Sequence, residues 1–134
     1  MKKKIIITGG LGYIGTELCK LYSGYSWSDE IIVIDNRFIS ERVSQLRNWN
    51  IKFVQGDILD KELINKYFKD ANVVHHLAGI TSVPRTKSES SKLQDEKIIE
   101  VGKQGTQNIL DVISKDCKII FPSTHVVYEG INQV

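Results

Sequence analysis

The chain has 134 residues, of which 41% are hydrophobic and 25% are charged, the composition of one ordinary soluble domain. Its 18 basic and 16 acidic residues leave a net charge of +2 with both signs interleaved, so the basic surface that a nucleic-acid-binding domain needs is absent. Its longest apolar runs have four residues, such as 31–34, far short of the roughly 20 that span a bilayer, so no membrane-spanning segment is expected.

Five short β-branched runs alternate with longer segments of helical period, a pattern typical of parallel βαβ units. The runs are continuously apolar, as in strands that helices cover on both faces. We expect strands at residues 4–8, 31–35, 51–55, 72–77 and 117–121.

The first helix is predicted between the first two strands, where an apolar stripe is expected to pack on the sheet. This stripe consists of Ile14, Leu18, Leu21 and Tyr22. Residues 40–50 are expected to form one short helix followed by a turn, and further helices are expected at residues 60–69 and 90–114. Gly105 on the apolar side of the last helix predicts a close approach to a neighbour. Loops are expected at residues 23–29 and 81–89.

These elements predict one domain, residues 1–134, with a Rossmann-type doubly wound α/β fold and the strand order 3-2-1-4-5. The order reverses between the first and fourth strands. A ligand is therefore expected at that point, outside the carboxyl ends of the strands.

Four glycines fall within seven residues between the first strand and the first helix, at Gly9, Gly10, Gly12 and Gly15. Without Cβ atoms in the way, a phosphate can approach the helix N-terminus, where N–H groups and the helix dipole stabilise an anion. Gly9, Gly12 and Gly15 then supply the turn, the approach and the helix–strand packing. A Walker-type P-loop is excluded because Thr16 stands where its lysine would be.

Asp35 ends the second strand, twenty residues after Gly15. Its carboxylate can accept hydrogen bonds from a ribose diol, and its charge would repel a 2′-phosphate. We therefore expect a dinucleotide site that prefers NAD over NADP, a preference that Arg37 weakens. The alternative is that the glycines only form a tight turn and that Asp35 only ends its strand.

Six motifs follow one another along the chain. They are Thr8-Gly9-Gly10-x-Gly12-Tyr13-Ile14-Gly15, Asp35-Asn36, Gly56-Asp57-Ile58, His76-Leu77-Ala78-Gly79, Gly105-Thr106-x-Asn108-Ile109-Leu110 and Phe121-x-Ser123-Thr124-x-x-Val127-Tyr128. In this order they resemble the extended short-chain dehydrogenase/reductase family, in particular its NAD-dependent nucleotide-sugar epimerases and dehydratases. The resemblance covers the whole chain.

The resemblance implies a role for each matching residue. It implies that Tyr13 and Ile14 contact the pyrophosphate, and that Asp35 and Asn36, with Arg37 beside them, contact the adenosine ribose. It also implies that Asp57 and Ile58 flank the adenine. The residues that it places toward the nicotinamide are Leu77, Ala78 and Gly79. Thr124 matches the catalytic Ser or Thr that hydrogen-bonds the reacting hydroxyl of the sugar.

Several of these residues also have a purely structural interpretation. Asp57 could simply cap a helix, since Asp is a favoured N-cap residue. Thr124 could be an ordinary turn hydroxyl. His75 and His76 lie on a buried strand, where packing with a satisfied ring nitrogen is expected rather than chemistry.

The chain departs from the family pattern at several positions. Gly102 stands where the family has an Asn that helps hold the active-site backbone. His125-Val126 replaces the Asp-Glu pair with which the dehydratases eliminate water, which argues against dehydration. Glu129 also separates Tyr128 from Gly130, where the family reads Val-Tyr-Gly.

The family's general base is a Tyr followed four residues later by a Lys, and none of the five tyrosines in the chain has that partner. The lysine lowers the pKa of the tyrosine, so that the phenolate can take a proton as hydride leaves. We therefore expect an N-terminal, NAD-binding part of a longer enzyme, truncated before the Tyr-Lys helix and inactive by itself.

The resemblance implies that the parent enzyme transiently oxidises a hydroxyl of a nucleotide sugar with NAD, most simply in a C4 epimerisation. Two alternatives stay open. One is a non-catalytic NAD(P)-binding or sensor module of the same fold, and the other is a dehydrogenase or reductase of another small alcohol.

Cys19 and Cys117 are isolated, so neither a zinc site nor a disulfide is expected, and no other metal site is predicted. Thr8-Gly9-Gly10 ends the apolar run that follows the N-terminal lysines, which argues against a signal peptide and favours the cytoplasm. The apolar edge of the fifth strand is open to pairing, which predicts self-association, for example as a homodimer.

Overall fold

The computed structural model describes residues 2–25, 28–80 and 92–123. At its centre is a parallel sheet in the order β3-β2-β1-β4-β5, formed by β1 (Lys4–Thr8), β2 (Glu30–Asp35), β3 (Lys52–Gln55), β4 (Val73–His76) and β5 (Lys118–Ile120). This confirms the predicted Rossmann-type fold and its strand order. Each strand begins and ends within one residue of its predicted bounds.

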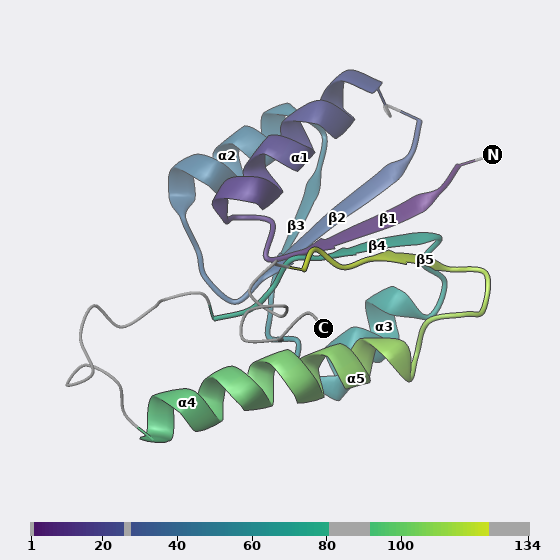
Figure 1. Ribbon diagram of the computed structural model, residues 1–134. Helices are drawn as coiled ribbons and strands as arrows, with labels where there is room; N and C mark the ends of the chain where they lie inside the picture. Colours follow the sequence, from purple (N-terminus) through teal and green to yellow (C-terminus); the bar gives the residue numbers. More distant parts are fainter. Residues whose placement is uncertain (1, 26–27, 81–91, 124–134) are drawn as a thin grey trace, which may run out of the picture.

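Helices cover both faces of the sheet (Figure 1). The helices α1 (Tyr13–Tyr25) and α2 (Ser40–Asn48) lie on one face, and α3 (Lys61–Phe68), α4 (Lys92–Ile99) and α5 (Thr106–Leu110) lie on the other. Alternate residues of β1 reach the two layers, because Ile5 and Ile7 belong to the core under α1 and α2, whereas Ile6 belongs to the core under α3 and α5. Burial on both faces explains why the strands are continuously apolar.

The register brings the carboxyl ends of the central strands level. Thr8, the last residue of β1, is paired with Ile34 of β2 on one side and with His76 of β4 on the other. The turns that leave β1, β2 and β4 therefore start side by side at one edge of the sheet. This is the edge at which the sequence predicts a ligand.

The predicted apolar stripe of α1 is confirmed for Leu18 and Tyr22 and wrong for Ile14 and Leu21. Gly15 and Cys19 are the buried residues of α1, and Leu18 and Tyr22 pack partly against the same core. Ile14 and Leu21, which were expected to face the sheet, are 68% and 59% exposed. The spacing of the apolar residues fitted a helix, but glycine carries no hydrophobic signal that could mark Gly15 as the side facing the sheet.

The long helix predicted at residues 90–114 consists of three joined segments. A π-helical segment, η2 (Glu100–Gly105), links α4 to α5, and α5 ends at Leu110. The predicted close approach at Gly105 is confirmed, since a Cβ there would lie 2.4 Å from Cδ1 of Ile58. No residue of α4 is buried, and the first residue of the long helix that packs against the core under α3 and α5 is Val101 of η2.

The connections between elements differ from the predicted loops at one point. Helix α1 continues to Tyr25, so residues 23–25 are helical and not part of a loop. The predicted loop at residues 81–89 lies outside the described residues. None of the helices in the described part of the chain is long and apolar enough to cross a membrane.

Candidate functional site

The glycine-rich turn leaves β1 after Thr8 and enters α1 at Tyr13. Gly9 has a φ of +68°, and its N–H donates to the carbonyl oxygen of Ile34 at 2.8 Å. A Cβ on Gly9 would lie 2.8 Å from the backbone nitrogen of Ala78, in the turn after β4. Only glycine allows both this φ and this approach. The turn thereby holds the carboxyl ends of β1, β2 and β4 together.

Gly15 and Gly12 meet different surroundings. A Cβ on Gly15 would lie 2.6 Å from Cα of Gly10 and 2.7 Å from the carbonyl oxygen of Gly9, so Gly15 allows α1 to pack on the turn. A Cβ on Gly12 would meet the same oxygen at 3.3 Å and, among the other described residues, Nη2 of Arg37 at 3.9 Å. The contact with the Gly9 oxygen is tight, but no further described atom lies within 4 Å, so a side chain at Gly12 would extend into the space beside the start of α1.

This open space suits a phosphate group. The first N–H groups of a helix have no acceptor within the helix, and they point toward its N-terminal end. Together with the positive end of the helix dipole they stabilise an anion. The turn at Gly12 leaves them accessible, so the residues present fit the diphosphate of a dinucleotide.

Asp35 lies beside the glycine turn at the end of β2, and its side chain is 3% exposed. Its Oδ2 accepts the N–H of Leu11 at 3.1 Å, which ties β2 to the turn. Its Oδ1 accepts the backbone N–H of Arg37 at 3.0 Å. The guanidinium of Arg37 also donates to this carboxylate, from Nε to Oδ1 at 3.2 Å and from Nη2 to Oδ2 at 3.4 Å.

His76, at the end of β4, joins three elements through its two ring nitrogens. Nδ1 lies 2.8 Å from Oγ1 of Thr8, and Nε2 lies 2.9 Å from Oγ1 of Thr106 in α5. Oγ1 of Thr8 also accepts the N–H groups of Leu77 and Ala78, each at 3.0 Å. The hydroxyl of Thr106 donates to the carbonyl oxygen of Gly102 at 2.6 Å.

The number of available hydrogens in this network determines the tautomer of His76. Because both lone pairs of the Thr8 oxygen accept backbone N–H groups, its hydroxyl hydrogen goes to Nδ1 of His76. Nε2 therefore carries the ring proton and donates to Thr106. Burial lowers the pKa of His76, so the ring is neutral at pH 7.

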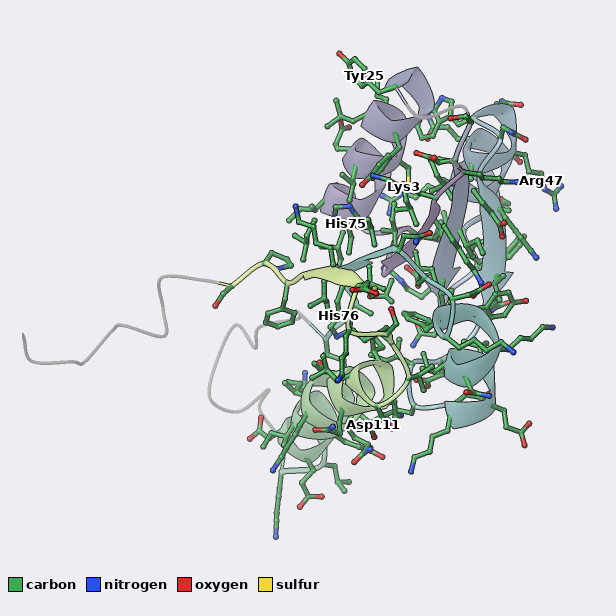
Figure 2. All side chains as sticks on the ribbon, turned by 90° about the vertical axis from the view of Figure 1, so that its right-hand side faces the viewer. Lys3, Tyr25, Arg47, His75, His76 and Asp111 are labelled. Carbon is green, nitrogen blue, oxygen red and sulfur yellow. The ribbon has the colours of Figure 1, made fainter. Side chains whose placement is uncertain are left out.

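His75 leaves β4 on the opposite face from His76 (Figure 2). Its Nε2 lies 2.6 Å from the hydroxyl oxygen of Tyr22, and the two rings meet edge to face with centroids 5.4 Å apart. Burial, followed by the charge of Lys118, lowers the pKa of His75, and burial raises the pKa of Tyr22. Each histidine thus has at least one satisfied ring nitrogen, as expected for residues of a buried strand.

The turn between β3 and α3 places its two predicted adenine residues differently. Asp57 is exposed, and its Oδ1 accepts the N–H of Leu59 at 2.9 Å. The alternative that Asp57 caps the helix is wrong, because Asp60 is the N-cap of α3. Ile58 is buried in the core, and its carbonyl oxygen accepts the side-chain N–H of Asn108 at 3.0 Å.

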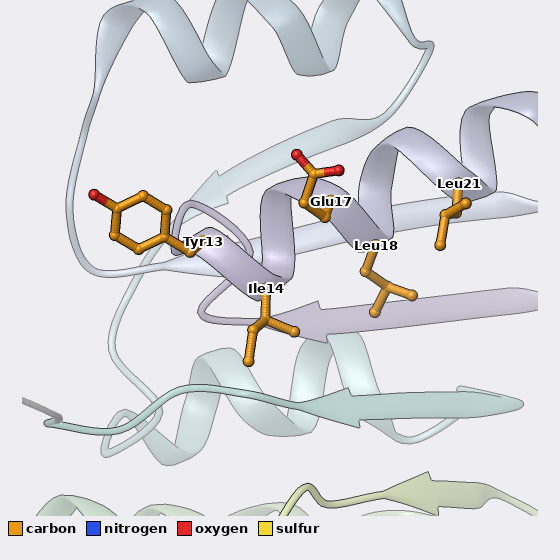
Figure 3. A pocket seen from close by; sticks show the side chains of 5 residues that line it. All are labelled: Tyr13, Ile14, Glu17, Leu18 and Leu21. Carbon is orange, nitrogen blue, oxygen red and sulfur yellow. The ribbon is translucent and has the colours of Figure 1, made fainter.

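Tyr13 and Ile14, the residues expected at the pyrophosphate, lie in the first turn of α1 and are 86% and 68% exposed. They also belong to an apolar hollow along one flank of the helix (Figure 3). Its lining residues are Tyr13, Ile14, Glu17, Leu18 and Leu21. The hollow is therefore a separate feature of α1 and not the open space at Gly12.

The remaining predicted residues follow the ends of β2 and β4. Asn36 is exposed after Asp35, and its carbonyl oxygen accepts a hydrogen bond from the side chain of Gln55 at 3.3 Å. Leu77 and Ala78 are half-buried and are held by Thr8, and Gly79 is exposed. Thr124 lies outside the described residues.

The residues that sequence reasoning left without a role are Thr8, Thr106 and Asn108. Thr8 and Thr106 are joined through His76, and Asn108 holds the backbone of Ile58. All three belong to the motifs that carry the family resemblance. A polar residue inside such a motif was the available signal, because polar groups that become buried, as Thr8 and Asn108 are here, need partners.

The chain matches the sequence model of the 3-beta hydroxysteroid dehydrogenase/isomerase family over residues 6–132. A dTDP-D-glucose 4,6-dehydratase of Dictyostelium discoideum is 33% identical over 94% of this chain and 30% of its own length. A UDP-glucose 4-epimerase of Neisseria meningitidis serogroup C is 30% identical over 94% of this chain and 38% of its own length.

A similar solved structure is the dTDP-glucose 4,6-dehydratase of Streptomyces venezuelae with NAD bound. It is 26% identical, with a TM-score of 0.66, and the alignment covers 81% of this chain and 35% of that one. The chain therefore spans about a third of the length of these relatives.

Proposed function

We propose that this chain, which belongs to the 3-beta hydroxysteroid dehydrogenase/isomerase family of extended short-chain dehydrogenases/reductases, is the NAD-binding part of an enzyme that acts on a nucleotide sugar. The observation that carries the proposal is the glycine turn, held by Gly9 against Ala78 and open at Gly12, with Asp35 beside it. The relatives are enzymes, and the structure of one of them contains NAD.

In this proposal each part of the edge binds a different part of the dinucleotide. The start of α1 holds the diphosphate on N–H groups, and Asp35 accepts hydrogen bonds from the adenosine ribose. Thr8 fixes the backbone at Leu77 and Ala78, which then forms a rigid wall on the nicotinamide side. Asp57 contacts the adenine. When bound, NAD supplies the acceptor and donor of hydride.

For the parent enzyme we propose C4 epimerisation of a nucleotide sugar. A UDP-glucose 4-epimerase is among the relatives. His125-Val126, in place of the Asp-Glu pair of dehydratases, argues against elimination of water. Thr124 is proposed to hydrogen-bond the reacting hydroxyl, with the Tyr-Lys pair supplied by sequence beyond residue 134, because an unactivated threonine hydroxyl is too weak a base.

A non-catalytic NAD(P)-binding module is the second candidate, favoured by Gly102, which lacks the side chain that the family uses to hold its active site. The complete reading frame separates the two. A Tyr-x-x-x-Lys downstream of residue 134 supports the enzyme, and its absence supports the module. The complete protein incubated with UDP-glucose is expected to form the C4 epimer, whereas the 134-residue chain alone is expected to form none.

The binding proposal is tested by calorimetric titration of the chain with NADH. We expect saturable binding at one site. Gly12→Val places a side chain in the open space beside α1 and is expected to weaken NADH binding at least about tenfold, since it blocks the diphosphate. Gly24→Val is the matched control, because nothing described lies within 4 Å of a Cβ there. Unchanged NADH affinity in Gly12→Val would contradict the proposed site.

We further propose that the protein functions in the cytoplasm and self-associates. Strand β5 lies at an edge of the sheet and pairs with β4 among the described residues, and Ile120 on it is 37% exposed. Unpaired strand edges favour pairing with another copy. Sedimentation velocity is expected to show a concentration-dependent dimer, and a single monomeric species at all concentrations would contradict this.

A further inference from the structure

We propose that His76 is a positioning residue that connects the nicotinamide end of the site to the long helix. It acts on the nicotinamide wall, which is the backbone of Leu77 and Ala78, and on the helix formed by α4, η2 and α5. The inference rests on the proposed function. It adds that occupation of the nicotinamide end is transmitted to the long helix through one imidazole ring.

The wall depends on His76 through a single oxygen atom. Oγ1 of Thr8 accepts the N–H groups of both wall residues at 3.0 Å, so both of its lone pairs are used. Because Thr8 is fully buried, its hydroxyl hydrogen needs an acceptor within the protein, and Nδ1 of His76 provides one at 2.8 Å. Without Nδ1, this hydrogen would be unsatisfied, and any rotation of the hydroxyl toward another acceptor would break its bonds to the wall.

The long helix is held by the other nitrogen of the same ring. Nε2 of His76 donates to Oγ1 of Thr106 at 2.9 Å, and the Thr106 hydroxyl donates to the carbonyl oxygen of Gly102 at 2.6 Å. Thr106 is the first residue of α5, and Gly102 lies in the π-helical segment η2. The ring therefore contacts the helix at the point where the π-helical segment ends.

The ring of His76 can make both contacts in one orientation only. A half-turn about its Cβ–Cγ bond would place carbon atoms where the two nitrogens now lie, and carbon can replace neither hydrogen bond. The side chain is buried, so water has little access to either partner. The ring of Phe121 lies beside it, with centroids 5.7 Å apart. These contacts fix the position of the helix relative to the wall.

The neighbouring histidine of β4 joins different elements. His75 leaves the strand on the opposite face and contacts the hydroxyl of Tyr22 in α1 (Figure 2). Both histidines are buried, and burial lowers the pKa of each. They have similar surroundings and differ in what they connect, so His75 serves as a matched control for His76.

A nicotinamide ring packed on the wall would restrict the movement of Leu77 and Ala78. Their N–H groups belong to one hydrogen-bonded chain with Thr8, His76 and Thr106, so the restriction extends to η2. Coupling between two sites is reciprocal in binding free energy. A helix held in this position therefore also favours the wall conformation that binds the nicotinamide.

The first test needs no substitution and uses amide NMR of the 134-residue chain. The probes are NADH and ADP-ribose, which lacks the nicotinamide. Both are expected to shift the signals of residues 9–15, and NADH alone is expected to shift those of residues 102–106, by a smaller amount. Equal shifts of residues 102–106 with the two probes would overturn the inference and leave the proposed function intact. Failure of both probes to bind would overturn the proposed function, and the inference with it.

The second test removes one contact at a time. His76→Asn offers an oxygen near the position of Nδ1 but does not reach Thr106. It is expected to keep NADH affinity within about twofold and to lose at least about half of the NADH-induced shift of residues 102–106. His76→Gln offers its amide near the position of Nε2 and leaves Thr8 without its acceptor. It is expected to weaken NADH at least about fivefold and ADP-ribose less than about twofold.

His75→Asn and His75→Gln are expected to change neither the ratio of the two affinities nor the induced shifts. A merely structural role of His76 would weaken both probes equally, so an unchanged ratio in His76→Gln overturns the inference. The same change of ratio in His75→Gln also overturns it. Thr106→Val keeps His76 and removes its acceptor, so it carries the test if the His76 variants do not fold. We expect Thr106→Val to lose the NADH-induced shift of residues 102–106, and a shift equal to that of the wild-type chain would contradict the proposal.

Discussion

The backbone of Gly9 is held from two sides. Its N–H donates to Ile34 in β2, and its α-carbon faces the backbone of Ala78 after β4. A left-handed φ of +68° costs an L-residue energy even where there is space for its side chain, and here there is none. The shape of the whole turn therefore depends on a residue without a Cβ.

Gly9→Ala is expected to lower the free energy of unfolding by about 2–4 kcal/mol, since it adds backbone strain to an overlap with Ala78. Gly24→Ala, in an open position of α1, is expected to raise it by up to about 1 kcal/mol, because alanine favours the helix. Urea unfolding measures both. Equal effects of the two substitutions would show that Gly9 is not constrained as described.

The protonation state of His76 also depends on the residues around it. Its Nδ1 already accepts a hydrogen bond from Thr8, so a second ring proton would have to displace that hydroxyl. Burial lowers the pKa of His76 below the 6.5 of an exposed histidine, and His75 is shifted in the same direction. The folded protein therefore binds fewer protons than the unfolded chain just below pH 6.5.

The free energy of unfolding is expected to change little near pH 7.5 and to fall as the pH drops from 6.5 toward the lower pKa values of the folded state. His76→Asn is expected to reduce this slope, and urea unfolding at several pH values measures it. In the wild-type chain, nitrogen NMR of His76 should show the neutral Nε2–H tautomer, and the Nδ1–H tautomer would contradict the network.

Asp70→Asn is the control for this pH dependence. The hydrogen bond from Lys4 lowers the pKa of Asp70, so its contribution is present above about pH 4 and is lost at lower pH. The substitution should therefore leave the slope between pH 5 and 6.5, set by the two histidines, unchanged. If Asp70→Asn lost that slope, the pH dependence would come from Asp70 and not from the histidines.

At the residue scale, the sequence predicted the glycine turn and Asp35 because the motif spacing ties them to the ends of adjacent elements. It did not predict the Thr8–His76–Thr106 network. These contacts join residues 68 and 30 positions apart, and they depend on the register of β1 with β4 and on the rotation of the long helix. The local sequence determines neither the strand register nor the rotation of the helix.

At the element scale, the strands were predicted almost to the residue because each is a short apolar run between polar segments. The buried face of α1 was not predicted correctly. Its sheet-facing positions include Gly15, which carries no hydrophobic signal, whereas the apolar side chains of Ile14 and Leu21 are exposed. The π-helical turn in the long helix had no sequence signal either. It lies where the Gly102 carbonyl accepts the hydroxyl of Thr106 and where Gly105 packs on Ile58.

The two glycines of η2 make a matched pair for testing this helix. Gly105→Ala is expected to lower the free energy of unfolding by about 1–3 kcal/mol, since its Cβ would overlap the buried side chain of Ile58. Gly102→Ala meets no described atom within 4 Å and is expected to raise it by up to about 1 kcal/mol. Urea unfolding of both compares them, and a destabilised Gly102→Ala would contradict the described packing.

At the scale of the whole molecule, the strand order and the handedness of the connections gather the candidate site at one edge. The strand order followed from the alternation of strands and helices, because right-handed crossovers leave few other topologies. The substrate region could not be predicted, since the chain spans about a third of its relatives. The part of the candidate site that these residues build themselves is therefore the cofactor edge.

The most direct test of that edge is amide NMR of the chain during titration with NAD⁺. The account predicts saturable shifts concentrated at residues 9–15, 35–37 and 77–79, where the turns after β1, β2 and β4 meet. It predicts little change near Lys2, Asp29 and Arg47, at the opposite edge of the sheet. Shifts centred on that opposite edge, or no saturable shift at all, would contradict the claim that the glycine turn binds a dinucleotide.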